Sequence, residues 1–223
     1  MNKILIFDLD DTLYPEITYV QSGFRAVSDW LEAQYGWLSN DTYHYLMQTL
    51  EAQGRGMVFN TFLHSKNRLS QQLVKQCLKI YRHHQPNISL APEALQFLQR
   101  WQAPLYLVTD GHKIVQHNKI QALGLSPYFT KTYITHRYGV TNAKPALHCF
   151  ELIRRQQQCS FQDLIYVGDN PTKDFVNLNK QGSTTVRVLT GEHRQVQAAT
   201  GYDAQHHINH LGELLKLLTQ LEG

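Results

Sequence analysis

The chain has 223 residues, a formal net charge of +3 and 42% hydrophobic residues, which is typical of a globular protein with one sizeable core and a small accessory domain. It contains no dense block of Lys and Arg, so a nucleic-acid partner is not indicated, and no apolar stretch approaches the length of a membrane span. Cys77, Cys149 and Cys159 form no close pair, which argues against a disulfide framework or a zinc site. We therefore expect a cytoplasmic protein, a monomer or homodimer, that does not bind nucleic acid or membranes.

Short apolar runs of strand length recur along most of the chain. Because they are almost continuously hydrophobic, they suit strands that are buried on both faces of a parallel sheet. The runs lie at 3–7, 105–108, 164–167 and 184–188, with a weaker one at 132–135. Most are separated by stretches with helical character, at 92–98, 115–123 and 145–157, and a closing helix is expected at 211–218. The alternation predicts an α/β fold with a doubly wound, mainly parallel sheet.

One region departs from this alternation. Between about residues 14 and 86 no clear strand is visible, and apolar residues recur at helical spacing. Val20, Phe24, Val27 and Leu31 share one helical face, and a second set (Leu69, Leu73, Cys77 and Ile80) shares another. The sequence therefore predicts a catalytic core formed by 1–14 and 87–223, with an inserted α-helical domain at 15–86.

The segment Asp8-Leu9-Asp10-Asp11-Thr12 directly follows the first predicted strand. In open parallel sheets the site lies beyond the carboxyl ends of the strands, and in an extended segment Asp8 and Asp10 share one face. Two close carboxylates repel each other unless a cation offsets their charge, and Mg²⁺ prefers oxygen ligands. By itself the pattern fits a polar loop with a helix cap equally well.

Three further polar groups follow predicted strands. Gly168-Asp169 comes directly after the strand at 164–167, with Asp174 five residues beyond Asp169, and offers more carboxylates for the same cation. Thr109-Asp110-Gly111 offers a hydroxyl and main-chain N–H groups for phosphate oxygens, although it is also good turn chemistry. Lys144, just before Pro145, is a surface residue in the simplest interpretation, but beside a carboxylate cluster it could hold a phosphate.

Taken together, these motifs resemble those of the haloacid dehalogenase superfamily of hydrolases. Asp8-X-Asp10-X-Thr12 is similar to the first motif of that family, Thr109 to the second, Lys144 to the third, and Gly168-Asp169 with Asp174 to the fourth. Phe7 to Pro15, and Thr109-Asp110-Gly111 with Gln116, Lys119 and Ile120, resemble the branch that carries a helical cap after the first strand.

The resemblance implies a phosphatase that acts on a small phosphorylated metabolite. Asp8 would be the nucleophile that forms an aspartyl-phosphate, and Asp10 would protonate the leaving oxygen and then activate water. Mg²⁺ would be bound by Asp8, the main-chain carbonyl of Asp10 and Asp169, with support from Asp174. Thr109, Asp110, Gly111 and Lys144 would bind the phosphoryl group. Asp10 also separates phosphatases from dehalogenases, which lack an aspartate there because a halide leaving group needs no proton.

Substrate choice is expected to depend on the helical insert. Candidates for substrate contact are Arg25, Arg55, Asn60 and His112, although a solvated surface position remains an alternative for each. The mixed polarity of the insert fits sugar phosphates, nucleoside monophosphates and phospho-acids equally. A phosphomutase or phosphotransferase would share every motif, and a non-catalytic regulatory protein on the same scaffold is the alternative outside enzymes.

Overall fold

The computed structural model describes residues 3–222 and consists of two compact units. One unit contains the chain up to Glu16 together with Ser89 onwards, and the other is Ile17–Ile88. Each boundary lies two residues after the one expected from the sequence.

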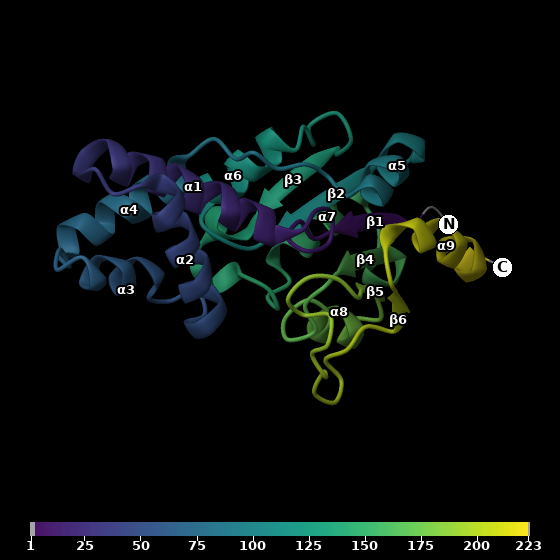
Figure 1. Cartoon of the computed structure of the whole chain (residues 1–223). Coiled ribbons are helices and arrows are strands. Elements are labelled where there is room, and N and C mark those ends of the chain that lie inside the picture. The colour runs from purple at the N-terminus through teal and green to yellow at the C-terminus, as the bar shows by residue number, and fades with distance from the viewer. Residues whose placement is uncertain (1–2, 223) are drawn as a thin grey trace. The chain divides into compact units, whose positions relative to one another are not determined.

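The first unit is built on a six-stranded parallel sheet with the strand order β3-β2-β1-β4-β5-β6 (Figure 1). The strands are β1 Ile4–Phe7, β2 Leu105–Thr109, β3 Lys131–Ile134, β4 Leu164–Gly168, β5 Thr184–Val188 and β6 His206–Ile208. β1 is central, pairing with β2 on one side and β4 on the other. The predicted α/β fold is confirmed, and the loop after β1 lies between the loops after β2 and β4.

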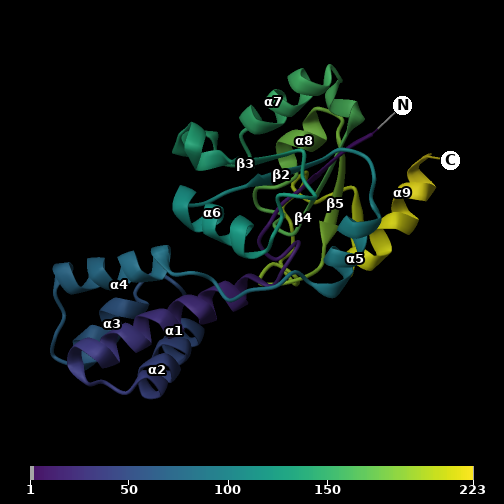
Figure 2. The same ribbon diagram turned by 90° about the horizontal axis from the view of Figure 1, so that it is seen from above.

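Helices cover both faces of the sheet (Figure 2). They are α5 Pro92–Arg100, α6 Lys113–Ala122, α7 His148–Gln157, α8 Val176–Lys180 and α9 Leu214–Glu222. Side chains alternate across the pleat. Ile4 and Ile6 of β1 belong to the core cluster that includes residues of α7 and α8, whereas the Phe7 ring lies 5.6 Å from that of Phe97 in α5. Burial on both faces explains why the strands read as continuous apolar runs.

Two elements differ from the sequence prediction. β6 was missed because it is short and only Ile208 of its three residues is buried, so His206 and His207 carry no apolar pattern. The helix expected from Pro145 begins at His148, and Lys144 before it is held by Asp110 and Asp8. None of the helices within residues 3–222 is both long and apolar enough to cross a bilayer.

The second unit is entirely helical. It contains α1 Glu16–Tyr35, α2 Ser39–Gln53, α3 Val58–Ser65 and α4 Gln71–His83. Only Glu16, the first residue of α1, belongs to the other unit. The four apolar residues predicted for one face of α1 are all buried in its core, as are Leu73 and Cys77 of α4. Ile80 is partly buried against the same core, and Leu69 lies outside it because it precedes α4 and is 48% exposed.

Candidate active site

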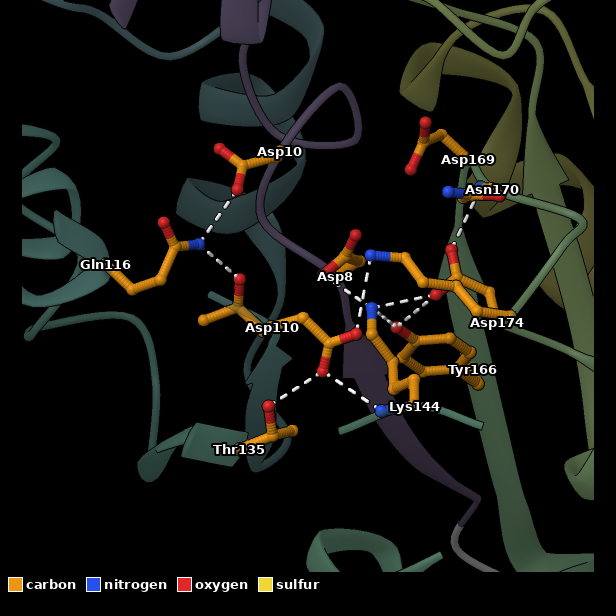
Figure 3. Close-up of polar contacts among 12 residues, drawn as sticks. Asp8, Asp10, Asp110, Gln116, Thr135, Lys144, Tyr166, Asp169, Asn170 and Asp174 are labelled. Carbon is orange, nitrogen blue, oxygen red and sulfur yellow. Dashed lines mark hydrogen bonds and ion pairs between the residues drawn. The ribbon is translucent and has the colours of Figure 1, made fainter. Parts of the chain in front are cut away.

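The polar residues singled out in the sequence lie at the carboxyl ends of three adjacent strands. Asp8 follows β1, Thr109 ends β2 and Asp169 follows β4. The main-chain N–H of Asp8 donates to the carbonyl of Val167 at 2.8 Å, which extends the pairing of β1 and β4 into the site. Parallel strands in register therefore bring the three residues to one edge of the sheet. Figure 3 shows Asp8 and Asp169 there.

Three carboxylates form a buried cluster at this edge. Asp8, Asp169 and Asp174 are 4%, 3% and 2% exposed, and each offers an oxygen within 4.8 Å of the others. Gly168 makes this packing possible, because a Cβ there would lie 2.6 Å from a carboxylate oxygen of Asp174. A main-chain N–H, that of Asn170, donates to the same Asp174 oxygen at 2.9 Å and fixes its position.

Lys144 partly neutralises the cluster. Its ammonium contacts Asp8 Oδ1 at 2.9 Å, Asp174 Oδ1 at 2.7 Å and the Tyr166 hydroxyl at 2.8 Å, which engages all three of its donors (Figure 3). Burial acts to lower the pKa of Lys144, but Asp174 and Asp8 raise it by more, so the amine is held charged. The site therefore contains a fixed, dehydrated cation.

Asp110 holds the Lys144 segment in place. One oxygen of its carboxylate accepts from Thr135 Oγ1 at 2.7 Å and from the main-chain N–H of Lys144 at 3.1 Å. The other lies 3.4 Å from the ammonium of Lys173. Its neighbour Gly111 has a φ of 129°, a conformation that favours glycine.

Burial disfavours the charged form of two carboxylates in the cluster. Burial raises the pKa of Asp8 to about 8, although Lys144 acts to lower it, and burial raises the pKa of Asp169 to about 6. Burial is the main cause of both shifts, and the neighbouring carboxylate of Asp174 adds to each. A divalent cation would favour the ionised forms, and three close carboxylate oxygens are a donor set that fits a hard cation such as Mg²⁺.

The carboxylate of Asp10 belongs to a separate network. It accepts from the Tyr14 hydroxyl at 2.6 Å, from Gln116 Nε2 at 2.8 Å and from the Lys119 ammonium at 2.7 Å. Gln116 Nε2 also donates to Thr109 Oγ1 at 2.7 Å. Burial acts to raise the pKa of Asp10, but Lys119 and these hydrogen bonds bring it below its usual range. The two aspartates of the first motif thus have different electrostatic surroundings.

Several members of these networks were not assigned a role from the sequence. For Gln116 and Lys119, the sequence indicates a link to the site only through the family resemblance. It predicts no site role for Tyr14, Tyr166, Thr135 or Lys173. Tyr166 is part of an apolar strand and Lys119 part of a helical pattern, so spacing alone does not separate them from core and surface residues. His193 was also missed, and its contact with Asp169 depends on a loop without periodic pattern.

The residues proposed for substrate choice are distributed over both units. Arg25, Arg55 and Asn60 belong to the helical unit, where the Arg25 guanidinium lies 4.0 Å from the centre of the Tyr43 ring and donates to Asn40 at 2.8 Å. His112 is exposed and is the residue immediately before α6 in the core unit. Their contact with a substrate stays a prediction.

Comparison with known proteins agrees with this geometry. The family model described as "Haloacid dehalogenase-like hydrolase" matches residues 5–188, so the chain belongs to this family, as the sequence motifs predicted. The glyceraldehyde 3-phosphate phosphatase of Methanocaldococcus jannaschii is 27% identical, over 100% of this chain and 99% of its own length. The ribulose-1,5-bisphosphate 5-phosphatase of Halopiger xanaduensis is 24% identical, over 98% of this chain and 100% of its own length.

Solved structures share the fold. A hydrolase of the same superfamily from Geobacter sulfurreducens superposes with a TM-score of 0.68 at 18% identity, covering 97% of this chain and 96% of that one. A 2-haloacid dehalogenase from Pseudomonas syringae gives 0.65 at 22% identity, covering 99% and 100%. This likeness shows the shared fold. The family match makes the chain a hydrolase of this family, and the relatives named as phosphatases agree with the enzyme class expected from Asp10.

Proposed function

We propose that this protein is a Mg²⁺-dependent phosphatase that hydrolyses a phosphomonoester of a small sugar, through an aspartyl-phosphate on Asp8. The observation that carries the proposal is that the two aspartates of the first motif have different surroundings. Asp8 lies in the buried acidic cluster with Lys144, whereas Asp10 is held apart by Gln116, Lys119 and Tyr14. A nucleophile and a proton carrier need different environments, and these two carboxylates have them.

In the first step, a carboxylate oxygen of Asp8 attacks phosphorus while the bond from phosphorus to the ester oxygen breaks. The leaving oxygen takes a proton from Asp10, and the product alcohol departs. In the second step, Asp10 removes a proton from water, which attacks phosphorus and releases Asp8 and inorganic phosphate. Phosphoryl transfer depends mainly on positioning and charge neutralisation, which suits a site rich in fixed charges.

The low pKa of Asp10 bears on these two steps differently. An ionised Asp10 is ready for the base step, in which it accepts a proton. For the acid step it must first be protonated, and the negative charge of a bound phosphoryl group favours this by raising the pKa of a nearby carboxyl group. Asp10 is thus proposed to alternate between the two states within one cycle.

The charged residues around Asp8 have complementary tasks in this proposal. Asp8, Asp169 and Asp174 would hold Mg²⁺, together with the main-chain carbonyl of Asp10 that the family resemblance implies. The cation would supply positive charge that favours the ionised form of Asp8 and offsets charge on the phosphoryl group. Lys144 supplies a second positive charge, and a phosphoryl oxygen would replace one of its present acceptors. Thr109 is proposed to contact another phosphoryl oxygen.

The substrate class rests on the relatives. Those described above are named for a triose phosphate and a pentose bisphosphate, and the alignments cover nearly the whole of each chain. A short sugar phosphate is therefore proposed for this protein as well. The helical unit Ile17–Ile88 is proposed to act as the cap that selects the substrate, with Arg25, Arg55 and Asn60 as candidate contacts.

Release of free phosphate from a panel of phosphorylated metabolites tests the function. The panel includes triose, pentose and hexose phosphates, nucleoside monophosphates and phospho-acids, with Mg²⁺ present. We expect triose or pentose phosphates to be hydrolysed fastest. Transfer of phosphate to a second sugar with no free phosphate would instead identify a phosphotransferase.

The variant Asp8→Asn tests the nucleophile. It should fold but lose steady-state turnover of every ester, because an amide cannot form the aspartyl-phosphate. Asp163→Asn is the matched control, since Asp163 is part of a capping box at Phe161–Asp163 and lies outside the site. Steady-state hydrolysis by folded Asp8→Asn would contradict the assignment.

A further inference from the structure

The loop after β5 reaches back to the catalytic loops. We call residues Thr190, Gly191, Glu192 and His193 the bracing segment. The hydroxyl of Thr190 donates to the main-chain carbonyl of Asp11, and the main-chain N–H of Glu192 donates to Asp11 Oδ2 at 3.2 Å. Asp11 also accepts from the main-chain N–H of Glu16 at 2.8 Å. The bracing segment is thereby fixed to the loop that carries Asp8 and Asp10.

Gly191 is the residue that allows this contact. It has a φ of 61°, and a Cβ at this position would lie 2.0 Å from Cγ of Asp11. Real side-chain atoms do not approach so closely, so only glycine fits between the bracing segment and Asp11.

A buried arginine fixes the other end of the bracing segment. Arg187 of β5 is 3% exposed, and its guanidinium donates to the carbonyls of His193 at 2.7 Å and Val196 at 2.8 Å. It also donates to Asp203 Oδ1 at 3.2 Å. Arg187 of β5 therefore fixes the main chain of His193. This limits the positions that the His193 side chain can reach.

The side chain of His193 contacts the acidic cluster. Its Nδ1 lies 2.8 Å from Asp169 Oδ2, where the histidine side chain is 27% exposed and the aspartate 5%. Lys144 pairs with the other two carboxylates, Asp8 and Asp174, so each member of the cluster has a partner. A donor on Oδ2 restricts rotation of the Asp169 carboxylate.

We propose that His193 is a positioning residue that orients Asp169 for binding of a divalent cation. The proposal rests on the proposed function for the identity of the cation. Carboxylates that bind metals are commonly held by hydrogen bonds of this kind, and loss of the partner weakens metal affinity. The bracing segment thus brings a rigid donor to the carboxylate that Lys144 does not contact.

Calorimetric titration of Mg²⁺ into the full chain, without substrate, tests the proposal. We expect His193→Ala to raise the Kd for Mg²⁺ by about 10–100-fold. His193→Asn should restore binding to within about 3-fold of the natural chain, because its amide N–H can occupy the place of Nδ1. At saturating Mg²⁺ the KM for the phosphate ester should change little, which separates metal binding from substrate binding.

His207→Ala is the matched control. His207 also pairs with an aspartate of the core unit, at 3.1 Å from Asp203 Oδ1, but Asp203 is not a member of the acidic cluster. Its removal should leave Mg²⁺ affinity unchanged. Circular dichroism and the thermal midpoint without Mg²⁺ verify that each variant is folded.

Two results would contradict the role of His193 as a positioning residue. If His193→Ala binds Mg²⁺ as tightly as the natural chain, or more tightly, His193 is not a positioning residue and instead is neutral or competes with the cation. Absence of Mg²⁺ binding in the natural chain would also overturn the proposal. A chain that binds Mg²⁺ through a His193-dependent site but hydrolyses no ester would leave the proposal standing while the proposed function fails.

Discussion

At the scale of single residues, Lys119 is a buried cation that pairs with two carboxylates. It is 2% exposed, and its ammonium lies 2.7 Å from Asp10 Oδ1 and 3.1 Å from Glu16 Oε1. Burial acts to lower its pKa, but the two carboxylates raise it by more. One buried cation thus balances two carboxylates, one of which is the proposed proton carrier.

Replacement of Lys119 by Met should therefore affect both stability and activity. Removing one partner of a buried ion pair leaves uncompensated charge, so we expect a loss of about 3–5 kcal/mol in the free energy of unfolding. The kcat should fall by about 10²-fold or more at saturating Mg²⁺, since Asp10 loses its orientation and its low pKa. Urea unfolding and steady-state kinetics measure the two effects.

Lys113→Met is the control for that experiment. Lys113 is exposed at the start of the same helix, α6, and its replacement should change the free energy of unfolding by no more than about 0.5 kcal/mol. Equal behaviour of the two variants would show that the position of Lys119 in the network is unimportant.

At the scale of elements, the loop after β5 can be tested through its glycines. Gly191 and Gly201 both have a positive φ, 61° and 78°. A Cβ at Gly191 would collide with Asp11, whereas a Cβ at Gly201 would have no neighbouring atom within 4 Å. Gly201→Ala should cost about 1–2 kcal/mol from backbone strain alone. Gly191→Ala should cost a further ~1–3 kcal/mol from overpacking against Asp11.

The two alanine variants should also differ in activity. Displacement of Asp11 would disturb the loop that carries Asp8 and Asp10, so Gly191→Ala should lower kcat while Gly201→Ala should not. Chemical unfolding gives the stability difference, and phosphate release gives the activity. Similar stability losses in both variants would mean that the loop yields without effect on Asp11.

The elements also show how far the sequence could be interpreted. Strands that are buried on both faces have continuous apolar sequences, and this pattern predicts β1, β2, β4 and β5. A parallel sheet then places Asp8, Thr109 and Asp169 at one edge. β6 lacks that run and was missed. The contact of His193 with Asp169 depends on the path of an irregular loop, held by Arg187, and neither periodicity nor motif spacing encodes such a path.

At the scale of the whole molecule, the proposed cation site lies entirely within one unit. Asp8, Asp169 and Asp174 all belong to the unit that contains the sheet, and none belongs to Ile17–Ile88. A ligand that binds only the folded state stabilises the unit that contains its site. Mg²⁺ should therefore stabilise the core unit directly, whatever the helical unit does.

Thermal unfolding with and without Mg²⁺ measures this coupling. At a free Mg²⁺ concentration 100 times the Kd, the stabilisation is about 2.7 kcal/mol, which corresponds to a rise of roughly 5–10 °C in the thermal midpoint of a chain of this size. If the units unfold in separate transitions, only that of the core unit should move. EDTA should abolish both the shift and the turnover, and added Mg²⁺ should restore them. Asp169→Asn should lose the shift because it removes a charged ligand, and a full shift in that variant would place the cation elsewhere.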